Sequence, residues 1–351
     1  MDETGNPGPE IRLPRRATVK DVARLAGVSA GTVSNALSGK RRVDDATRGR
    51  IEAAIAELGY IPNIAARGVR TGRANTIALF SSMPTAVAAG PSKLGFMMEI
   101  AASAAMTALN RNVALVLVPP IAGPAEALRN VSFDGALLVE PAEDDPFLAL
   151  LSSRAIPTVV IGEPPVAAGR HVELHYGATA RLLVRHMLET GARAFPLMLG
   201  QSRRQSHAAF ERVYLEEMAA AGLAPRVIRV DETGGEAAAA GAIRAELAAA
   251  PGLDGVLVPV DALATGVMAG LRAAGRRVPQ DVRVATRYDG IRARTETPPL
   301  TAVDLHLDRV SEIATEALLD LIEGAPPAEI PLPPLPLLVP RASTLATPAE
   351  G

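Results

Sequence analysis

A run of small polar side chains lies between residues 29 and 35 of this 351-residue chain, in the sequence SAGTVSN. The hydroxyl groups of Ser29, Thr32 and Ser34 are suited to hydrogen bonds with phosphate oxygens or base edges. The amide of Asn35 matches the paired donor and acceptor of adenine, which makes Asn35 the strongest candidate for direct base recognition. Its alternative role is a helix-surface residue that contacts only water or phosphate. The chemistry that this run predicts is recognition of DNA.

Two short helices joined by a glycine turn would present these side chains. The first is predicted from Val19 to Ala26, because Thr18 can cap its N-terminus and Asp21 places a carboxylate in the first turn, where the helix dipole favours it. Gly27 ends this helix, since glycine adopts the left-handed conformation at little cost. The predicted buried face is Val22, Ala23, Leu25 and Ala26.

The second helix is predicted to begin after Ser29, which caps it. Val33 and Leu37 then face inward. The positions left for solvent or DNA are Ala30, Gly31, Thr32, Ser34 and Asn35. By spacing alone, an ordinary helical hairpin explains the pattern nearly as well, because small helical hairpins are common.

A third amphipathic helix is predicted between residues 43 and 59, capped by Asp44 or Asp45. Its apolar stripe is Ile51, Ile55 and Leu58. Three helices around a shared apolar centre make a unit of the size of known DNA-binding modules. The third helix therefore favours DNA recognition over a plain hairpin.

Charge is distributed unevenly along the chain. From Arg15 to Arg73 there are 12 lysine and arginine residues against 5 aspartate and glutamate residues, a net charge of +7. Because the whole chain carries −2, the remainder carries −9. A basic module on an acidic body suits binding to a polyanion by one end only. Lys40 and Arg42, with a third basic residue between them, are expected to add electrostatic affinity.

The composition excludes several other classes of protein. The sequence has 0 cysteines, which excludes disulfides and thiol chemistry, and its 5 histidines show no metal-site spacing, so no metal or cofactor is expected. No phosphate-binding glycine loop or nucleophile elbow follows a predicted strand, which makes an enzyme a remote alternative. No apolar run of about 18 residues is present to span a membrane. Residues 1–16 lack the pattern of a signal peptide, so we expect a cytoplasmic protein with a mobile N-terminal tail.

From residue 76 onward, short apolar runs alternate with helical segments. The predicted strands are residues 76–82, 113–118, 135–140, 158–162, 196–200, 227–230, 255–260 and 282–286, and the predicted helices lie near 92–110, 177–190, 206–222, 235–250 and 261–274. Such alternation indicates mostly parallel sheets covered on both faces by helices, and the strands are too many for one compact sheet. Two lobes are therefore predicted, with a ligand cleft between them at the carboxyl ends of the strands.

The motifs of the N-terminal region, taken in order, resemble a known family. They are VKDVARLAGVS, TVS, Thr47 with Arg48, LGYIPN at residues 58–63 and RTGR at residues 70–73. This series is similar to the DNA-binding headpiece and hinge helix of the lactose/galactose repressor family of bacterial regulators. The body resembles the periplasmic-binding-protein-like effector domain of the same family, through FDGALLVEP, LDGVLVPVDALATGVMAGLRAAGRRVPQDVRV, PPLTAVDLHLDRVSEIATEALLDLIEG and LLVPRAST.

The resemblance implies a multidomain fold class, with an all-α helix-turn-helix headpiece and an α/β two-lobed periplasmic-binding-protein-like domain. The implied parts are an N-terminal tail (1–16), the headpiece (17–61), a hinge helix and linker (62–74), an effector-binding and dimerisation domain (75–341) and a C-terminal tail (342–351). Lobe one would comprise about 75–162 and 291–322, and lobe two about 163–290 and 323–341.

The function implied by the resemblance is that of a sequence-specific DNA-binding transcriptional repressor. A small-molecule effector, such as a sugar or related metabolite, would control its affinity for operator DNA. The alternative is a DNA-binding repressor or architectural protein whose pocket no longer responds to a ligand. A homodimer is expected, because one headpiece offers a small interface, and the C-terminal segment lacks the apolar heptads of a coiled-coil tetramer.

Individual DNA contacts also follow from the resemblance. Phosphate contacts are assigned to Thr18, Ser29, Thr32, Thr47, Tyr60 and Asn63, and base contacts to Ala30, Gly31, Ser34 and Asn35. Larger side chains are usual in the family at positions 30, 31 and 35, so a different operator preference is expected. Residues 63–70 resemble the hinge helix, with Arg67 at the DNA and Val69, in place of the usual leucine, as the minor-groove wedge.

The effector contacts follow the family pattern less closely. Where sugar-binding members have an arginine in a second-lobe helix, this chain has His207 or Ala208, and their later acidic pair is replaced by the segment Arg287, Tyr288 and Asp289. Asp261 is retained, although its position favours a helix cap over a ligand contact. Ser81 and Ser82 end the first strand and are candidate hydroxyl contacts. These departures argue against a simple sugar.

Overall fold

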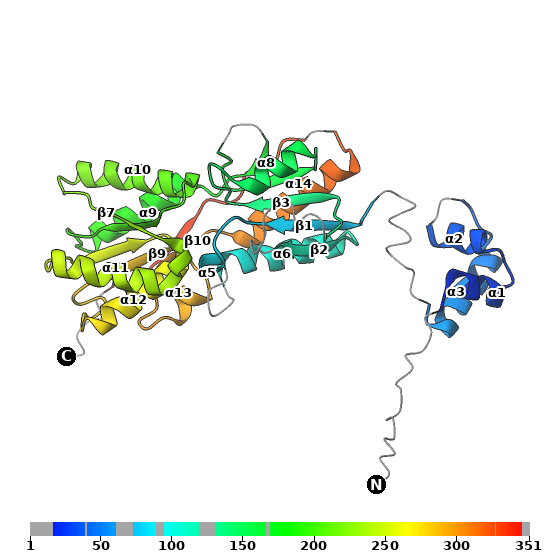
Figure 1. The fold of residues 1–351 in the computed structure, drawn as a ribbon, viewed down its shortest axis with the longest axis horizontal. Helices are drawn as coiled ribbons and strands as arrows, with labels where there is room; N and C mark the ends of the chain where they lie inside the picture. The colour runs from blue at the N-terminus through cyan, green and yellow to red at the C-terminus, as the bar shows by residue number, and fades with distance from the viewer. Residues whose placement is uncertain are drawn as a thin grey trace, which may run out of the picture. The chain divides into compact units, whose positions relative to one another are not determined.

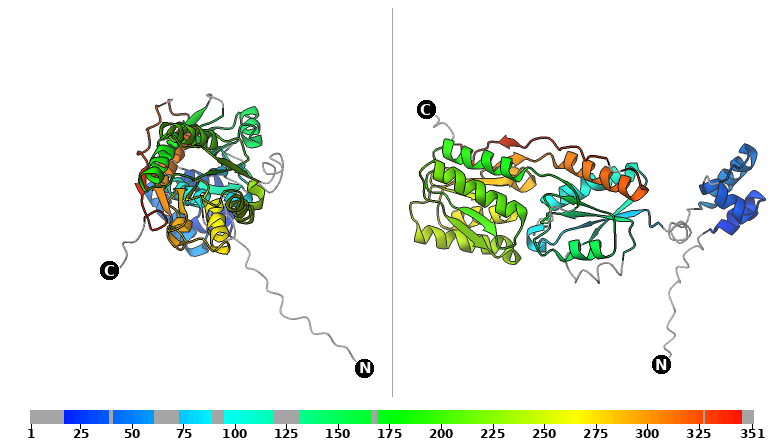
Figure 2. Two further views of the ribbon diagram at one scale, coloured as in Figure 1. Left: turned by 90° about the vertical axis from the view of Figure 1, so that its left-hand side faces the viewer. Right: turned by 90° about the horizontal axis from the view of Figure 1, so that it is seen from above.

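The chain forms two compact units, Met1–Arg73 and Ala74–Gly351, in a computed structural model. The residues described are 17–38, 41–60, 73–88, 95–118, 131–165, 169–326 and 328–345, and Figures 1 and 2 show their arrangement. Some predictions fall outside these residues. They are the N-terminal tail, the hinge segment from residue 62 to residue 72, and the DNA contacts Lys40, Asn63, Arg67 and Val69.

The first unit contains helices α1 (Val19–Ala26), α2 (Ala30–Ser38) and α3 (Asp45–Leu58). The predicted cap of α1 is confirmed: the Thr18 backbone N–H and hydroxyl donate to Asp21 Oδ2 over 2.9 and 2.7 Å, and the Asp21 N–H donates back to the Thr18 hydroxyl. Gly27 ends α1 with φ 66°, as predicted. Of the two candidate caps of α3, Asp44 is the one used, since it accepts from the Thr47 N–H over 2.9 Å.

The core of this unit is small and is centred on Val22, Val33 and Ile51. The predicted burial of Leu25 is wrong, because this side chain is 44% exposed. At 3.6 residues per turn it lies about 110° from the middle of the buried face of α1. Leu37 was also predicted to face inward and is 40% exposed, since Ala36 makes the packing contact in the last turn of α2.

The second unit contains two sheets, which confirms the prediction of two lobes. The first lobe has the strand order β2 (Ala114–Val118), β1 (Thr76–Phe80), β3 (Gly135–Val139), β4 (Thr158–Ile161) and β5 (Arg170–Val172), all parallel. Alternate residues of β1 point to opposite faces. Ile77 and Leu79 pack with α6 (Phe96–Asn110) and α14 (Leu307–Glu323), and Phe80 packs with α8 (Pro146–Ser153).

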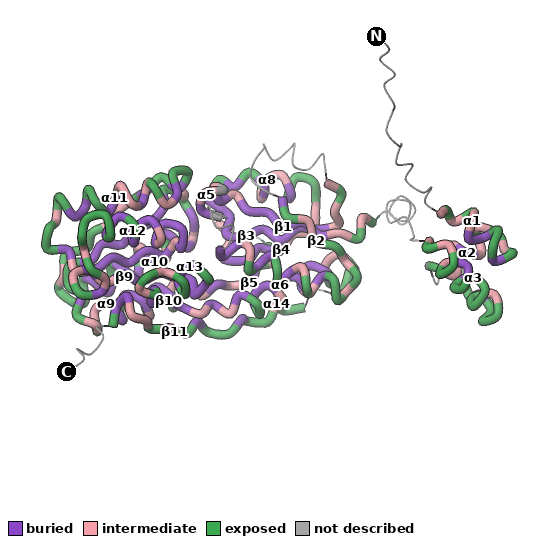
Figure 3. The backbone as a smooth tube through the Cα atoms, turned by 90° about the horizontal axis from the view of Figure 1, so that it is seen from below, coloured by how far each residue is buried: buried purple, intermediate pink, exposed green. Residues whose placement is uncertain are grey.

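The second lobe has the order β11 (Leu337–Val339), β10 (Thr301–Asp304), β9 (Arg283–Tyr288), β8 (Gly255–Val258), β6 (Leu197–Gly200) and β7 (Val227–Val230), with β11 antiparallel. Helices α9 (Tyr176–Glu189) and α10 (Gln205–Ala220) share a core with one face of this sheet. Helices α11 (Gly235–Ala249) and α12 (Asp261–Ala273) pack on the other face. The burial pattern in Figure 3 follows these layers, with the strands mostly buried and the outer helix faces exposed. Short helices α5 (Thr85–Ala88), η1 (Glu232–Gly234) and α13 (Ile291–Thr295) complete the described elements.

The chain crosses between the lobes at three places in its described part, and the predicted lobe boundaries miss two of them. Strand β5 was assigned to lobe two but pairs with β4 of lobe one, and β10 was assigned to lobe one but pairs with β9 of lobe two. The chain passes into the other lobe shortly after each of these two strands, at the residue that precedes the next helix. These residues, His175 and His306, have φ of 48° and 51°. The third crossing joins α14 to β11.

The C-terminal tail, predicted from residue 342, is ordered in its first residues. Ser343 and Thr344 are buried, and their hydroxyls form hydrogen bonds with residues of the second sheet. The Ser343 hydroxyl donates to the Val284 carbonyl over 2.6 Å and accepts from the Thr301 N–H over 2.8 Å. The sequence-based boundary was therefore placed too early.

Candidate functional site

The polar residues predicted to contact DNA lie at the helix N-termini of the first unit. The Ser29 hydroxyl accepts from the Thr32 N–H over 3.0 Å and lies 2.9 Å from the Thr32 hydroxyl. The Thr47 hydroxyl accepts from Arg50 over 3.2 Å. These side chains cap the helices locally and remain at the surface, exposed or half-buried, where backbone N–H groups and hydroxyls suit a phosphate.

Helix α2 carries the residues predicted to face the bases. Gly31 is exposed, and Ser34 and Asn35 are half-buried. Ala30 differs from the prediction in part, because its methyl group packs against the small core as well as bordering solvent. Tyr60 likewise packs against this core, whereas Arg42 is exposed. The face of α2 predicted to meet the bases therefore carries small side chains. Asn35 is the largest of them.

The cleft of the second unit is lined by groups at the carboxyl ends of strands from both lobes. Glu140 follows β3, Glu232 follows β7, and Arg287 lies near the end of β9. The full lining is Met83, Val87, Phe96, Met97, Glu140, Arg204, Ser206, His207, Phe210, Glu232, Pro259, Val260, Asp261, Arg287 and Tyr288. About 30 Å³ is open between these side chains, far less than the roughly 300–1,000 Å³ of typical ligand pockets, so a sugar-sized ligand requires them or the lobes to move.

A buried ion pair joins the two lobes across this cleft. Arg287 Nη1 of β9 donates to Glu140 Oε1 over 2.7 Å, and the two side chains are only 10% and 5% exposed. The Arg287 guanidinium also lies 4.8 Å from the centre of the Phe96 ring and 5.8 Å from that of Tyr176. Burial and the Glu140 carboxylate raise the pKa of Tyr176 well above its usual value, so this phenol stays protonated.

Other contacts cross the cleft beside this pair. Arg204, the residue before α10, donates to the Glu140 backbone carbonyl and lies 3.5 Å from the Ser82 hydroxyl. The Tyr288 hydroxyl of lobe two donates to Glu99 of α6, while its ring meets Phe96 edge-on at 5.7 Å. Glu140, Arg204 and Tyr288 therefore line the cleft and also join the two lobes.

Asp261, at the start of α12, is buried beside a second arginine. Its Oδ1 accepts from the Ala262 N–H over 2.8 Å, but the predicted helix cap is wrong, because Val260 holds the N-cap position and Asp261 is the first residue of the helix. Its Oδ2 has no hydrogen-bond partner and lies 3.8 Å from Nε of Arg292, whose Nη1 is paired more closely with Glu236 at 2.6 Å. Burial raises the pKa of Asp261, and Arg292 opposes that rise.

His207 and Glu232 line the cleft from the second lobe. His207 Nδ1 lies 2.9 Å from the Ser202 carbonyl, and burial lowers the pKa of its imidazole, which favours the neutral ring. Glu232 accepts from the Ser202 N–H over 3.1 Å and from the Ser202 hydroxyl.

The structure brings four of the predicted effector residues to the cleft. His207, Asp261, Arg287 and Tyr288 line it. Three others do not belong to its lining. Ser81 is buried and donates to the Val139 carbonyl, Ser82 lies beside Arg204, and Asp289 pairs with Arg341 and Arg294 at 2.5 and 3.3 Å.

Sequence reasoning missed Glu140, Arg204 and Glu232. Glu140 is the last residue of a predicted strand, and Arg204 and Glu232 lie 4 and 2 residues after the strands predicted to end at residues 200 and 230. A charged residue directly after a buried strand was therefore the available signal. Sequence reasoning looked for the family's second-lobe arginine at positions 207 and 208, which lie in the first turn of α10. Arg204 is the residue directly before that helix.

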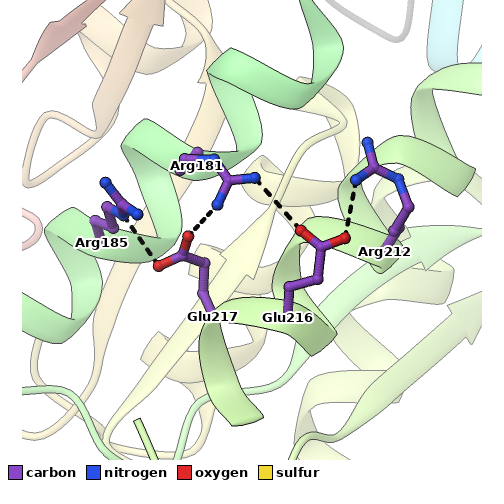
Figure 4. Close-up of polar contacts among 5 residues, drawn as sticks. All are labelled: Arg181, Arg185, Arg212, Glu216 and Glu217. Carbon is purple, nitrogen blue, oxygen red and sulfur yellow. Dashed lines mark hydrogen bonds and ion pairs between the residues drawn. The ribbon is translucent and has the colours of Figure 1, made fainter. Parts of the chain in front are cut away.

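A second charged cluster lies on the outer surface of lobe two, where α9 packs on α10 (Figure 4). Glu217 accepts from Arg181 and, over 3.0 Å, from Arg185. Glu216 lies 3.4 Å from Arg181 and 2.9 Å from Arg212. The hydrogen bond from Arg185 is the largest cause that lowers the pKa of Glu217. Each carboxylate here is bound by two arginines.

Neither cluster is a metal site within the described part of the chain, where no group of three histidine, aspartate or glutamate side chains is arranged to hold a metal ion. Across the same residues, no helix is both long and apolar enough to cross a membrane.

Comparison with known proteins agrees with this arrangement. Residues 18–63 match the family model of bacterial regulatory proteins, lacI family, and residues 184–344 match a periplasmic binding protein-like domain. Over 327 residues the chain is 32% identical to the HTH-type transcriptional regulator CelR of Thermobifida fusca, covering 88% of this chain and 93% of that protein. The chain belongs to the LacI family of bacterial regulatory proteins.

Other members of the LacI family are similar over nearly the whole chain. The ribose operon repressor of Escherichia coli is 28% identical over 339 residues, covering 93% of this chain and 99% of that one. A solved complex of CelR with cellobiose has a TM-score of 0.68 at 28% identity, covering 93% of this chain and 100% of that one. A Lac repressor dimer bound to operator and an anti-inducer has a TM-score of 0.77 at 23% identity, covering 95% and 100%, which shows the shared fold. The chain is a DNA-binding transcriptional regulator and not an enzyme, as predicted.

Proposed function

We propose that this regulator represses transcription as a homodimer and that a small molecule in the cleft controls its affinity for operator DNA. The observation that carries the proposal is the set of contacts between Glu140 and the two arginines Arg204 and Arg287, which join the lobes through the residues of the cleft itself. A ligand that competes for these groups changes the relation of the lobes. It alters DNA affinity only to the extent that it binds the two arrangements unequally.

The proposed DNA contacts are those of the headpiece and hinge. Asn35 is proposed to contact a base, with Ala30, Gly31 and Ser34 lying against the groove. The proposed phosphate contacts are Thr18, Ser29, Thr32, Thr47, Tyr60 and Asn63, supported by the exposed Arg42 and by Lys40 and Arg67, and the proposed minor-groove wedge is Val69.

The proposed dimer face lies on lobe one, along α6 and the edge strand β2. The large apolar side chains Met106, Leu109 and Leu117 are 62%, 60% and 38% exposed there. Strand β2 has a neighbour on one side only, because it ends the order of the first sheet. A second copy covering this face would bury these side chains and place two headpieces on one DNA site.

The proposed effector is a hydroxyl-bearing metabolite of the sugar class. Buried acids and arginines at the cavity suit hydroxyl groups as acceptors and donors, while Phe96, Phe210 and Tyr288 offer apolar ring surface. The similarity to a regulator solved with cellobiose supports this class.

The proposal is tested by selecting bound sequences from a random DNA pool with the full chain, then measuring operator affinity with and without metabolites. We expect a two-fold symmetric site, a dimer by light scattering, and an affinity that falls about 10³-fold as salt rises from 50 to 200 mM if about six phosphates are contacted. The variant Asn35→Ala is expected to lose preference at one base pair in each half-site.

A flat salt response, or unchanged base preference in Asn35→Ala, contradicts the proposed DNA contacts. Metabolites that bind without changing operator affinity favour the alternative of a repressor that does not respond to its ligand.

A further inference from the structure

Arg204 differs from the other buried arginines near the cleft in the groups that it contacts. Arg204 is only 4% exposed and lines the cavity. Its guanidinium contacts two neutral acceptors, the Glu140 carbonyl and the Ser82 hydroxyl, and its Nε has no hydrogen-bond partner. No aspartate or glutamate oxygen lies within 4.0 Å of it among the residues that the structure describes.

The other buried arginines of this region each have an acid. Arg287 pairs with Glu140 at 2.7 Å, and Arg292 pairs with Glu236 at 2.6 Å and approaches Asp261 at 3.8 Å. A buried charge is costly unless a counter-charge or several hydrogen bonds compensate it. Arg204 has less compensation than either of them.

Two acidic side chains, Asp261 and Glu232, line the same cavity as this cation. Asp261 Oδ2 has no hydrogen-bond partner, and Glu232 has no lysine, arginine or histidine nitrogen within 4.0 Å in the described residues. Burial raises the pKa of Asp261, which reduces its negative charge but leaves an oxygen to accept or donate a hydrogen bond. These oxygens suit hydroxyl groups.

We propose that the effector is a carboxylate-bearing polyol, such as a sugar acid, whose carboxylate binds Arg204. Its hydroxyls donate to Asp261 Oδ2 and Glu232. The planar guanidinium fork matches a carboxylate with two parallel hydrogen bonds, which a neutral sugar does not supply. The assignment rests on the proposed function, because it takes the cleft to be the effector site. It adds the chemical group that the effector must carry.

The test is calorimetric titration of the full-length protein with matched pairs of compounds. The pairs are gluconate with sorbitol and cellobionate with cellobiose, which differ in the carboxylate, and glucose 6-phosphate serves as a phosphate-bearing probe. We expect the carboxylate compound of at least one pair to bind about 10- to 100-fold more tightly than its neutral partner, the range for a hydrogen-bonded charge. Tighter binding of glucose 6-phosphate than of the carboxylate compounds would overturn the assignment.

Arg204→Gln is expected to remove that preference, since the amide keeps a donor for the Glu140 carbonyl but loses the charge. Arg204→Lys is expected to retain part of it and serves as a second variant if the glutamine variant fails to fold. The matched control is Arg203→Gln, because Arg203 is the preceding residue and its side chain is 69% exposed. It should leave both affinities unchanged.

The inference is overturned if the neutral compound of each pair binds as tightly as the acid, if Arg204→Gln leaves the preference intact, or if no carboxylate compound binds. Release of operator DNA by cellobiose, independent of Arg204, would overturn the inference while leaving the proposed function in place. Operator binding by the variants, measured alongside, shows that they remain folded.

Discussion

The cleft and the outer surface of lobe two use the same residue types and differ in how completely they are paired. On the α9–α10 surface, Glu216 and Glu217 are each bound by two arginines, and those arginines are 40–60% exposed. In the cleft, Arg204, Asp261 and Arg287 are buried and each keeps a polar atom without a hydrogen-bond partner. Charged residues alone therefore do not mark a binding site in this protein. In the cleft, three buried charged residues with unpartnered polar atoms line one cavity, which makes it the candidate binding site.

The largest effect is expected when the buried pair of the cleft is broken. Glu140→Gln leaves Arg287 buried without its acid, and we expect the free energy of unfolding of the body to fall by about 3 kcal/mol. Urea unfolding followed by circular dichroism measures it. As the control, Glu143→Gln affects an exposed partner of Arg203 and should cost less than about 0.5 kcal/mol. Equal losses for the two variants would remove the distinction between buried and exposed pairs.

A smaller loss is expected on the α9–α10 surface. Glu217→Gln removes a carboxylate that is 11% exposed and bound by Arg181 and Arg185, and we expect a loss of about 1 kcal/mol. The same urea measurement applies, with Glu189→Gln on the same helix pair as the control. A loss as large as that of Glu140→Gln would show that exposure of the arginines does not weaken the interaction.

The two regions should also respond oppositely to pH. Hydrogen bonds from Arg185 and Arg181 lower the pKa of Glu217, so its contribution is present above the unfolded value of about 4.3 and is lost as pH falls through the folded value. Burial raises the pKa of Asp261, so folding favours its protonated form and stability is lost as pH rises above about 4.

Unfolding curves from pH 3 to pH 7 should therefore show Glu217→Gln losing stability relative to the parent chain as pH rises from 3 to about 4.3, and Asp261→Asn gaining it above about pH 4. Parallel curves for the two variants would contradict the assigned directions of both pKa shifts.

The smallest effect is expected for an exposed member of the surface cluster. Arg212 contacts Glu216 at 2.9 Å, but the two side chains are 60% and 46% exposed. Arg212→Ala should cost less than about 0.5 kcal/mol, and added salt should reduce the difference further. A loss above 1 kcal/mol would indicate that the cluster acts as one network.

The features that were predictable from sequence depend on nearby residues. The caps of Thr18 and Asp44 involve the residue three positions later, and Gly27 acts on its own helix end. The central strands were recognisable as apolar runs. By contrast, β5 (Arg170–Val172) and β10 (Thr301–Asp304) are short and carry charged residues, and they are strands because distant segments pair with them.

The cleft was only partly predictable for the same reason. Glu140 and Arg287 are 147 residues apart in the chain and meet because two sheets face each other. The family pattern pointed to His207 and Asp261 by position, but it held no information on which charges would pair across the lobes. Leu25 shows the same limit within the headpiece, where helix spacing alone misjudged its burial.

The third crossing between the lobes differs in stiffness from the other two. Its residues 328–336 include Pro331, Pro333, Pro334 and Pro336, whose rings fix the backbone φ, whereas His175 and His306 are single pivots in the left-handed region. His175 Nε2 lies 3.1 Å from the Pro333 carbonyl, so one pivot is attached to the proline segment. We therefore expect the proline segment to resist separation of the lobes more than the other two crossings do, and to allow rotation about its own length. If a ligand in the cleft moves the lobes, as proposed, we expect that movement to be a rotation more than a separation.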